Sequence, residues 1–265
     1  MNSTKAKISA IRSNGYPLDF GTVFEHAFEN YKKIVLYAGL MLLVFSVLIS
    51  MVSMAGLISY VGVENLEEFG KKLEQMSSSK VMPTEIALPL NLGLLLFSAI
   101  INPFMAGFFK MADCGEKGEE FHIATMFTYY KLPYFINLFI VVFVVGILDT
   151  GITLTLQSTE YSWIGSVITT LISFLTFLTV PLIVFGNLNA FEALQSSIVV
   201  VSKQPIILLG LLIVAVIAGL IGIFGLCIGI FFTLPFMYSM NYVIYKTIVG
   251  IDEVEEIEEI KINEN

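Results

Sequence analysis

The chain has 265 residues, of which 56% are hydrophobic and 14% are charged, and its mean hydropathy is +0.84. This composition excludes a soluble globular domain and is typical of polytopic membrane proteins. The formal net charge of −8 belongs mainly to the C-terminal tail, since seven acidic residues lie in the last 14 positions. An acidic balance of this kind predicts no nucleic-acid partner.

The first 33 residues include Gly15, Pro17 and Asp19 but no short apolar core that ends in a small-residue cleavage site. A removable signal peptide is therefore not expected. We expect residues 1–17 to be a flexible cytoplasmic N-terminus, followed by a membrane domain over residues 18–250.

Long charge-free runs predict six transmembrane helices, because about 20 apolar residues cross a bilayer core of about 30 Å. The predicted helices are residues 34–60, 86–112, 133–157, 162–187, 204–222 and 226–248. The last run must fold back on itself, and its glycines predict a tight hairpin there: Gly219, Gly222, Gly225 and Gly229. The expected fold class is all-α, with the six helices arranged as three hairpins.

The basic residues predict that both termini are cytoplasmic. With six spans, 11 of the 14 Lys and Arg residues fall on one side of the membrane, and only Lys71, Lys72 and Lys80 fall on the other. The positive-inside rule makes the first side cytoplasmic. Cys114 and Cys227 then lie on opposite sides, so no disulfide is predicted.

A short amphipathic stretch that ends in lysine precedes each odd-numbered span. The three lead-in stretches are TVFEHAFENYKKI, FHIATMFTYYKLP and NAFEALQSSIVVVSKQP. Thr22 and Glu25 in the first, and Asn189 and Glu192 in the third, have the spacing of a capping box. We expect each stretch to be a short helix in the membrane interface, with its lysine near the head groups.

Prolines recur at corresponding places and predict an internal repeat. Each even-numbered span has a proline followed by two large apolar residues: Pro103, Pro181 and Pro235. Two residues after the lysine of each lead-in, the first unit has Ile34, the second has Pro133 and the third has Pro205. Proline at this position suits the first turn of the next helix. The repeated units are expected over about residues 18–112, 119–187 and 188–248.

The three span prolines have two interpretations. Because proline leaves a backbone carbonyl unsatisfied, three kinked helices predict a small polar cavity in the inner half of the membrane. Its candidate lining residues are Asn102, Asn187, Ser239 and Asn241. Alternatively, the prolines only set curvature and packing.

Asp149 is the one carboxylate that is predicted to fall within a span. It lies roughly 24 Å along the third helix, some 6 Å short of the outer edge of the bilayer core. Intramembrane acids are candidates for proton or cation sites. The alternative is a side chain that reaches water at the membrane edge, with Thr150 and Thr153 solvating it locally.

The residue types that metal and nucleotide chemistry require are scarce. His26 and His122 are the only histidines, and no GxxxxGK[ST], Gly-x-Ser-x-Gly or HExxH motif occurs. We therefore predict that the protein is not an enzyme and has no catalytic residue, metal or cofactor.

Three stretches carry a family resemblance: FEHAFENYKK, NAFEALQSSIVVVSKQP and GLIGIFGLCIGIFFTLPF. Through them, most of residues 18–250 resembles uncharacterised bacterial membrane proteins related to the membrane domain that accompanies some glycerophosphodiester phosphodiesterases. The resemblance implies a stand-alone six-helix domain of unknown activity in a bacterial inner (plasma) membrane. No segment here is long enough to be the catalytic domain, so no hydrolase chemistry is carried over.

The acidic tail, residues 251–265, is expected in the cytosol because an anionic inner leaflet repels it. It is either solvated or a site for a protein partner. For the whole chain, we expect a non-catalytic module that binds or handles a lipid or other amphiphile in the inner leaflet. The alternatives are a small transporter or permease, and a membrane assembly or regulatory subunit.

Overall fold

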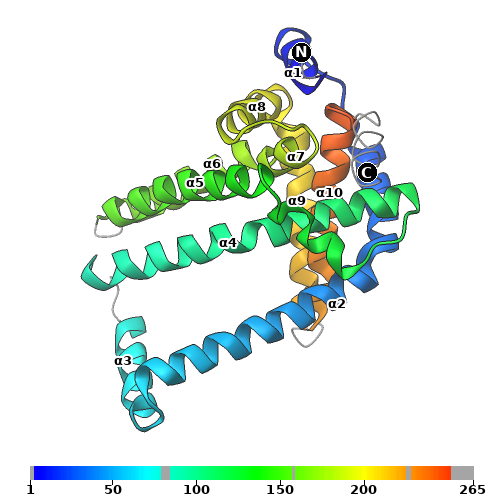
Figure 1. The fold of residues 1–265 in the computed structure, drawn as a ribbon. Coiled ribbons are helices and arrows are strands. Elements are labelled where there is room, and N and C mark those ends of the chain that lie inside the picture. The colour runs from blue at the N-terminus through cyan, green and yellow to red at the C-terminus, as the bar shows by residue number, and fades with distance from the viewer. Residues whose placement is uncertain (1–2, 79–83, 157–158, 225–227, 252–265) are drawn as a thin grey trace.

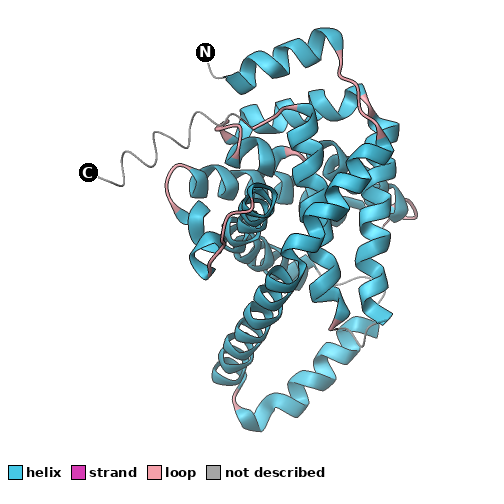
Figure 2. Cartoon of the chain, turned by 90° about the vertical axis from the view of Figure 1, so that its right-hand side faces the viewer, coloured by secondary structure: helices cyan, strands magenta, loops and turns pink. Residues whose placement is uncertain are grey.

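The computed structural model describes residues 3–78, 84–156, 159–224 and 228–251. All regular structure in these residues is helical, so the all-α class is confirmed (Figure 2). The elements are α1 Ser3–Asn14, α2 Phe20–Val61, η1 Val63–Asn65, α3 Leu66–Ser78, α4 Thr84–Lys117, η2 Ile123–Tyr130, α5 Tyr134–Leu156, α6 Ser162–Thr176, α7 Thr179–Val184, α8 Ala190–Lys203, α9 Pro205–Ile221, η3 Gly222–Phe224 and α10 Gly229–Ile248. Cys227 and the acidic tail from residue 252 onward lie outside the described residues.

Within the described part of the chain, five stretches are long and apolar enough to cross a membrane. They are Phe20–Ser59, Ala87–Lys117, Tyr134–Leu156, Ser162–Val184 and Pro205–Phe224. The sixth predicted span forms α10, but this helix is not among the five. It carries Thr233, Ser239, Asn241 and Lys246, and most of its second half is buried against other helices.

The first lead-in stretch is not a separate interfacial helix, contrary to the prediction. It forms the start of α2, which continues for 42 residues from Phe20 to Val61. Ile34 occupies the position where the other two units have proline, and isoleucine does not break a helix. The predicted capping box of Thr22 and Glu25 is also wrong, because the N-cap is Asp19, whose carboxylate accepts a hydrogen bond of 2.8 Å from the Thr22 N–H.

The other two lead-in stretches do end at their prolines. The third is α8, and the side chain of its N-cap Asn189 accepts a hydrogen bond of 3.0 Å from the Glu192 N–H, as predicted. The second is the 3₁₀ helix η2 rather than an α-helix. Pro205 is the first residue of α9, and α5 begins directly after Pro133.

The predicted helix over residues 162–187 is broken into α6 and α7, just before Pro181. The hydroxyl of Ser197 in α8 donates to the Leu175 carbonyl at 2.8 Å and accepts from the Leu178 N–H at 3.3 Å. A side chain from α8 therefore satisfies backbone groups that the break releases.

The residues expected to form a flexible N-terminus instead form α1, which packs on α8. Ile8 and Ile11 of α1 are buried, and Lys5 pairs with Glu192 at 2.7 Å. The apolar residues at every third or fourth position give α1 a face that α8 covers.

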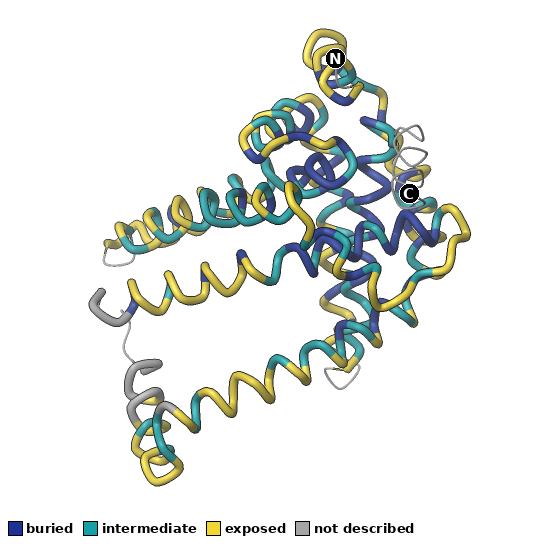
Figure 3. Tube along the Cα trace, in the orientation of Figure 1, coloured by how far each residue is buried: buried dark blue, intermediate teal, exposed yellow. Residues whose placement is uncertain are grey.

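The buried residues lie mainly at one end of the molecule, where α4, α7, α8 and α10 meet (Figure 3). From this core, the far ends of α2, α4, α5 and α6 extend away with apolar side chains exposed (Figure 1). The α9–α10 hairpin crosses the direction of α4 and α5 in the same view. Gly222 and Gly229 allow its two helices to meet, because a Cβ on Gly222 would lie 2.7 Å from the Gly229 carbonyl carbon.

Candidate functional site

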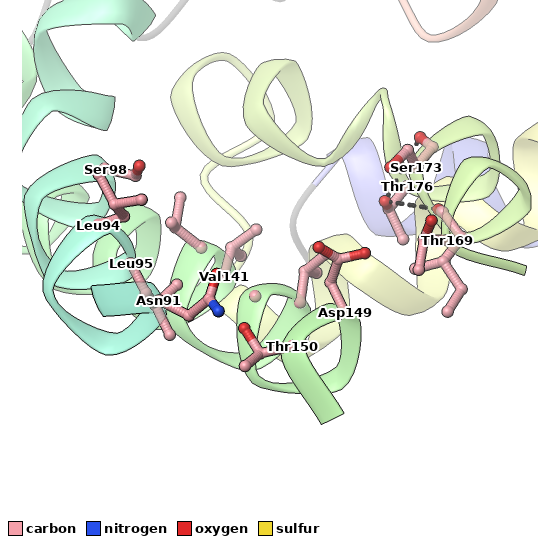
Figure 4. Close-up of a pocket in the computed structure, with 14 residues that line it drawn as sticks. Asn91, Leu94, Leu95, Ser98, Val141, Asp149, Thr150, Thr169, Ser173 and Thr176 are labelled. Carbon is pink, nitrogen blue, oxygen red and sulfur yellow. Dashed lines mark hydrogen bonds between the residues drawn. The ribbon is translucent and has the colours of Figure 1, made fainter. Parts of the chain in front are cut away.

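A cavity of about 420 Å³ lies between three of the candidate membrane spans, α4, α5 and α6 (Figure 4). Its polar lining residues are Asn91, Ser98, Asp149, Thr150, Thr169, Ser173 and Thr176. Leucine, valine and isoleucine side chains, with Gly146, form the rest of its wall. The cavity therefore combines an apolar enclosure with a few polar groups, as small-molecule sites generally do.

The helices that form the cavity are held together beside it by a close contact. A Cβ on Gly146 of α5 would overlap the side chain of Leu95 in α4. Glycine at this position lets α4 approach α5 one helical turn before Asp149. The carboxylate of Asp149 then lies between Asn91 on the α4 side and Thr169 on the α6 side (Figure 4).

Several polar groups of the cavity donate their hydrogens within their own helix. The side-chain amide of Asn91 donates to the Ala87 carbonyl at 2.7 Å, and the Thr176 hydroxyl donates to Ile172 at 2.8 Å. The Thr169 hydroxyl donates to Ser166 at 3.2 Å. Their oxygen atoms keep lone pairs for other partners.

Asp149 makes no hydrogen bond or ion pair with any described residue. Its carboxylate, which only accepts, is the one charged group among the described residues that line the cavity, and the hydroxyls of Ser98, Thr150 and Ser173 can both donate and accept. Such a site suits a ligand that donates hydrogen bonds or carries a positive charge.

The residues predicted to line a cavity at the proline kinks have separate partners. Asn102 donates to the Leu138 carbonyl of α5 at 3.2 Å, and Asn187 accepts from the Tyr134 hydroxyl at 2.8 Å. Ser239 is fully buried and donates to the Ala27 carbonyl of α2 at 2.7 Å.

Asn241 has a buried side-chain oxygen without a hydrogen-bond partner among the described residues. None of the four predicted lining residues belongs to the cavity around Asp149.

Carbonyls near two of the prolines already have side-chain partners. The Tyr130 hydroxyl donates to the Ile100 carbonyl at 3.0 Å, three residues before Pro103. The Tyr31 hydroxyl donates to the Phe232 carbonyl at 3.0 Å, three residues before Pro235. Pro103 and Pro235 remove the N–H partners of the Ala99 and Phe231 carbonyls, each one residue earlier, so both interpretations of the prolines stay open.

Sequence reasoning missed an ionic network that joins α2, α4 and α10. Glu116 of α4 accepts from His26 at 2.8 Å and from Lys246 at 3.0 Å. Asp113, only 2% exposed, accepts from the Tyr242 hydroxyl at 3.1 Å.

Two lysines of α4 complete the network around Asp113: Lys110 and Lys117 each lie 3.2 Å from its carboxylate. Their spacing of three and four residues from Asp113 was visible in the sequence and predicts such pairs. The contributions of α2 and α10 had no local signal.

No protein-family model, curated protein or solved structure matches this chain. The resemblance to the phosphodiesterase-associated membrane domains therefore stays a prediction, and the function has to be argued from the residues of this chain.

Proposed function

We propose that this protein is a non-catalytic membrane module that binds an amphiphile with a cationic or hydrogen-bond-donating head group. The cavity between α4, α5 and α6 is the binding site, and its single carboxylate is the main contact for the head group. The observation that carries the proposal is Asp149, an acidic side chain without a described partner in a cavity bounded by three candidate spans.

The energetic reason for a cationic partner is the position of the carboxylate. A charged side chain within a span costs several kcal/mol unless water or an opposite charge compensates it. Asp149 lies seven residues before the end of α5 at Leu156, about 10 Å along the helix axis. A head group held near that depth leaves its hydrocarbon part within the bilayer core.

The proposed topology has six spans, cytoplasmic termini and a bacterial inner membrane. In this topology α10 is the sixth span, which requires the α9–α10 hairpin to lie more nearly parallel to α4 and α5 in the bilayer than in the crossed arrangement of Figure 1. Because α2 and α9 cover it, polar residues such as Ser239 face protein rather than lipid, which membrane helices tolerate. Asp149 then lies in the outer half of the membrane, so the proposed site moves away from the inner leaflet.

Binding is tested by native mass spectrometry of the full chain released from its own membrane, beside Asp149→Asn and Asp149→Glu variants. We expect a defined amine- or hydroxyl-bearing amphiphile on the wild type, retained by Asp149→Glu and reduced about tenfold or more by Asp149→Asn. Glu160→Gln, at an exposed position near the start of α6, is the control substitution. Equal occupancy of one ligand in the wild type and Asp149→Asn would exclude Asp149 as its contact.

The topology needs introduced cysteines, because Cys114 is only 5% exposed and would label poorly. In a background where both native cysteines are serine, Ser13→Cys in α1 and Glu68→Cys in α3 are exposed reporters. An impermeant maleimide should label Glu68→Cys in intact cells and Ser13→Cys only after the membrane is opened. The reverse pattern would overturn the orientation.

A small cation-coupled transporter is the second candidate, favoured by the same unpaired carboxylate. It predicts ligand flux into proteoliposomes that depends on a cation gradient and is lost in Asp149→Asn. Binding without flux in the same preparation supports the non-catalytic module instead.

A further inference from the structure

A second concave surface lies on the opposite part of the fold, where α2, α9 and α10 meet. It is a groove of about 260 Å³, separate from the cavity that contains Asp149. One wall consists of Phe24, Phe28 and Tyr31 of α2, and the other consists of aliphatic residues of α9, including Ile217 and Ala218. We name it the aromatic groove.

Aromatic rings form the floor and one wall of the aromatic groove. The ring of Phe236 lies edge-on to those of Phe24, Phe28 and Tyr31, with centroids 6.0, 6.3 and 5.5 Å away. This T-shaped packing is the preferred arrangement for aromatic pairs. Because Phe236 is buried, the floor of the groove belongs to the packed core, whereas the Phe28 and Ile217 side chains of its walls are exposed.

The two hydroxyl groups that line the groove already have backbone partners. Tyr31 donates to the Phe232 carbonyl at 3.0 Å, and Thr233 donates to the Gly219 carbonyl at 3.0 Å. At about 30 Å³ per molecule, the groove has room for roughly eight waters, but its walls offer them few hydrogen bonds. An apolar occupant suits this surface better than water does.

The position of the groove indicates which apolar occupant reaches it. Its α9 wall belongs to one of the five candidate membrane spans. Along the same helix, Ile213, Val216 and Leu220 expose their side chains beside the groove. The groove therefore opens onto a surface that membrane hydrocarbon covers.

A positive charge lies at the rim of the groove. The Lys32 amine lies 5.5 Å from the centre of the Phe28 ring and 2.5 Å from a carboxylate oxygen of Glu29. Both members of this pair are about half exposed, so the amine can exchange Glu29 for another anion at little cost. A lipid phosphate fits this position when its chain lies along the aromatic wall.

We propose that the aromatic groove binds one acyl chain of a bilayer phospholipid, with the lipid phosphate at Lys32. This lipid occupies a fixed place between α2 and the α9–α10 hairpin, unlike lipids that exchange freely around the spans. The site is independent of the proposed Asp149 ligand, so either proposal stands if the other fails.

The test is fluorescence quenching by a phosphatidylglycerol with dibrominated chains, titrated into the full chain in detergent micelles. The single tryptophan, Trp163, is first replaced by Phe, and a new tryptophan is introduced at Phe28 in the groove. The matched reporter is Leu36→Trp, on the same helix but 70% exposed and outside the groove. The lipid fraction that half-quenches the Phe28→Trp reporter should be at least about threefold lower than the fraction that half-quenches the Leu36→Trp reporter. A threefold difference corresponds to about 0.65 kcal/mol of binding free energy.

Two further variants separate the chain site from the phosphate site. Ala218→Phe fills the groove and should remove the difference between the two reporters. Lys32→Gln should reduce the difference in part, and no change would overturn the phosphate contact. If Phe28→Trp does not fold, Ile217→Trp reports from the opposite wall.

Equal quenching curves for the groove and Leu36 reporters would overturn the proposal. The proposal would also be overturned if a second copy of the chain occupied the groove. In that case lipid would not quench the groove tryptophan, and cross-linking would give a dimer.

Discussion

The hydroxyl of Tyr31 donates a hydrogen bond of 3.0 Å to the carbonyl oxygen of Phe232, although 201 residues separate them in the chain. Phe232 lies three residues before Pro235. In the same way, Tyr130 donates to Ile100, three residues before Pro103. Each tyrosine thus bonds a carbonyl in the helical turn before a proline, one residue after the carbonyl that the proline deprives of its N–H partner.

The two tyrosines also hold equivalent places in the proposed repeat. Tyr31 lies three residues before Ile34, and Tyr130 lies three residues before Pro133. The lead-in of the first unit therefore contacts the proline helix of the third unit, and the lead-in of the second contacts that of the first. Ser197, from the third lead-in, bonds the break before Pro181 in the second unit. Ser197 lies eight residues before Pro205, so its position differs from those of the two tyrosines, and the repeat stays a prediction.

Replacement of Tyr31 by Phe should destabilise the protein by about 0.5–1.5 kcal/mol, because the Phe232 carbonyl loses its side-chain hydrogen bond but keeps its backbone partner within α10. Thermal unfolding in detergent measures the change. Tyr161→Phe, at a position 60% exposed, is the control and should have little effect. A similar Tm for both variants would mean that the Tyr31 hydrogen bond has no net stabilising role.

Replacement of Asp113 by Ala should destabilise the protein by about 1–3 kcal/mol, because it leaves the buried Tyr242 hydroxyl without its acceptor, whereas Lys110 and Lys117 are partly exposed and can turn to water. The Tyr242 hydroxyl and two lysines contact this carboxylate, which is only 2% exposed. The comparison is Glu67→Gln, whose pair with Lys71 is exposed and contributes about 0–1 kcal/mol. Equal unfolding temperatures in the two variants would show that the network has no net stabilising role.

Substitution of Gly107 by Ala should weaken the contact between α4 and η2. A Cβ at this position would lie 2.6 Å from the backbone of Met126, and backbone cannot rotate away as a side chain can. We expect a loss of about 1–3 kcal/mol. Gly93→Ala in the same helix has open space and should be neutral or stabilising, since Ala favours a helix by about 1 kcal/mol.

The contact between α1 and α8 should depend on pH. The hydrogen bond from Lys5 lowers the pKa of Glu192 below its ordinary value of 4.5. A carboxylate whose pKa is lowered by folding stabilises the folded state fully when the pH is above its ordinary pKa. This stabilisation is lost as the pH falls through the lower pKa of the folded state. Proteolysis of the N-terminal segment should therefore increase below about pH 4.5.

Glu192→Gln provides the control for this pH dependence, because its side chain does not titrate. Its N-terminal segment should be cleaved at a rate that does not rise over the same pH range. A rise equal to that of the wild type would place the titrating group elsewhere.

Local sequence determined the class of this protein and the limits of most of its helices. Charge-free runs predicted the spans, because bilayer thickness sets their length. Proline at positions 133 and 205 marked helix starts, and Asn189 marked the cap of α8, because caps and breaks act within one helical turn. The continuity of α2 follows from the same rule, since Ile34 stands where proline does in the other units.

Only the tertiary structure decided where the polar groups meet. The prolines suggested a polar cavity at the kinks, but the predicted lining residues Asn102, Asn187 and Ser239 bond to residues of other helices instead. One cavity lies around Asp149, where three helices leave space between them, and the aromatic groove beside Pro235 is lined mainly by apolar side chains. A sequence shows which groups need partners, but the packing of separate helices determines which partners they receive.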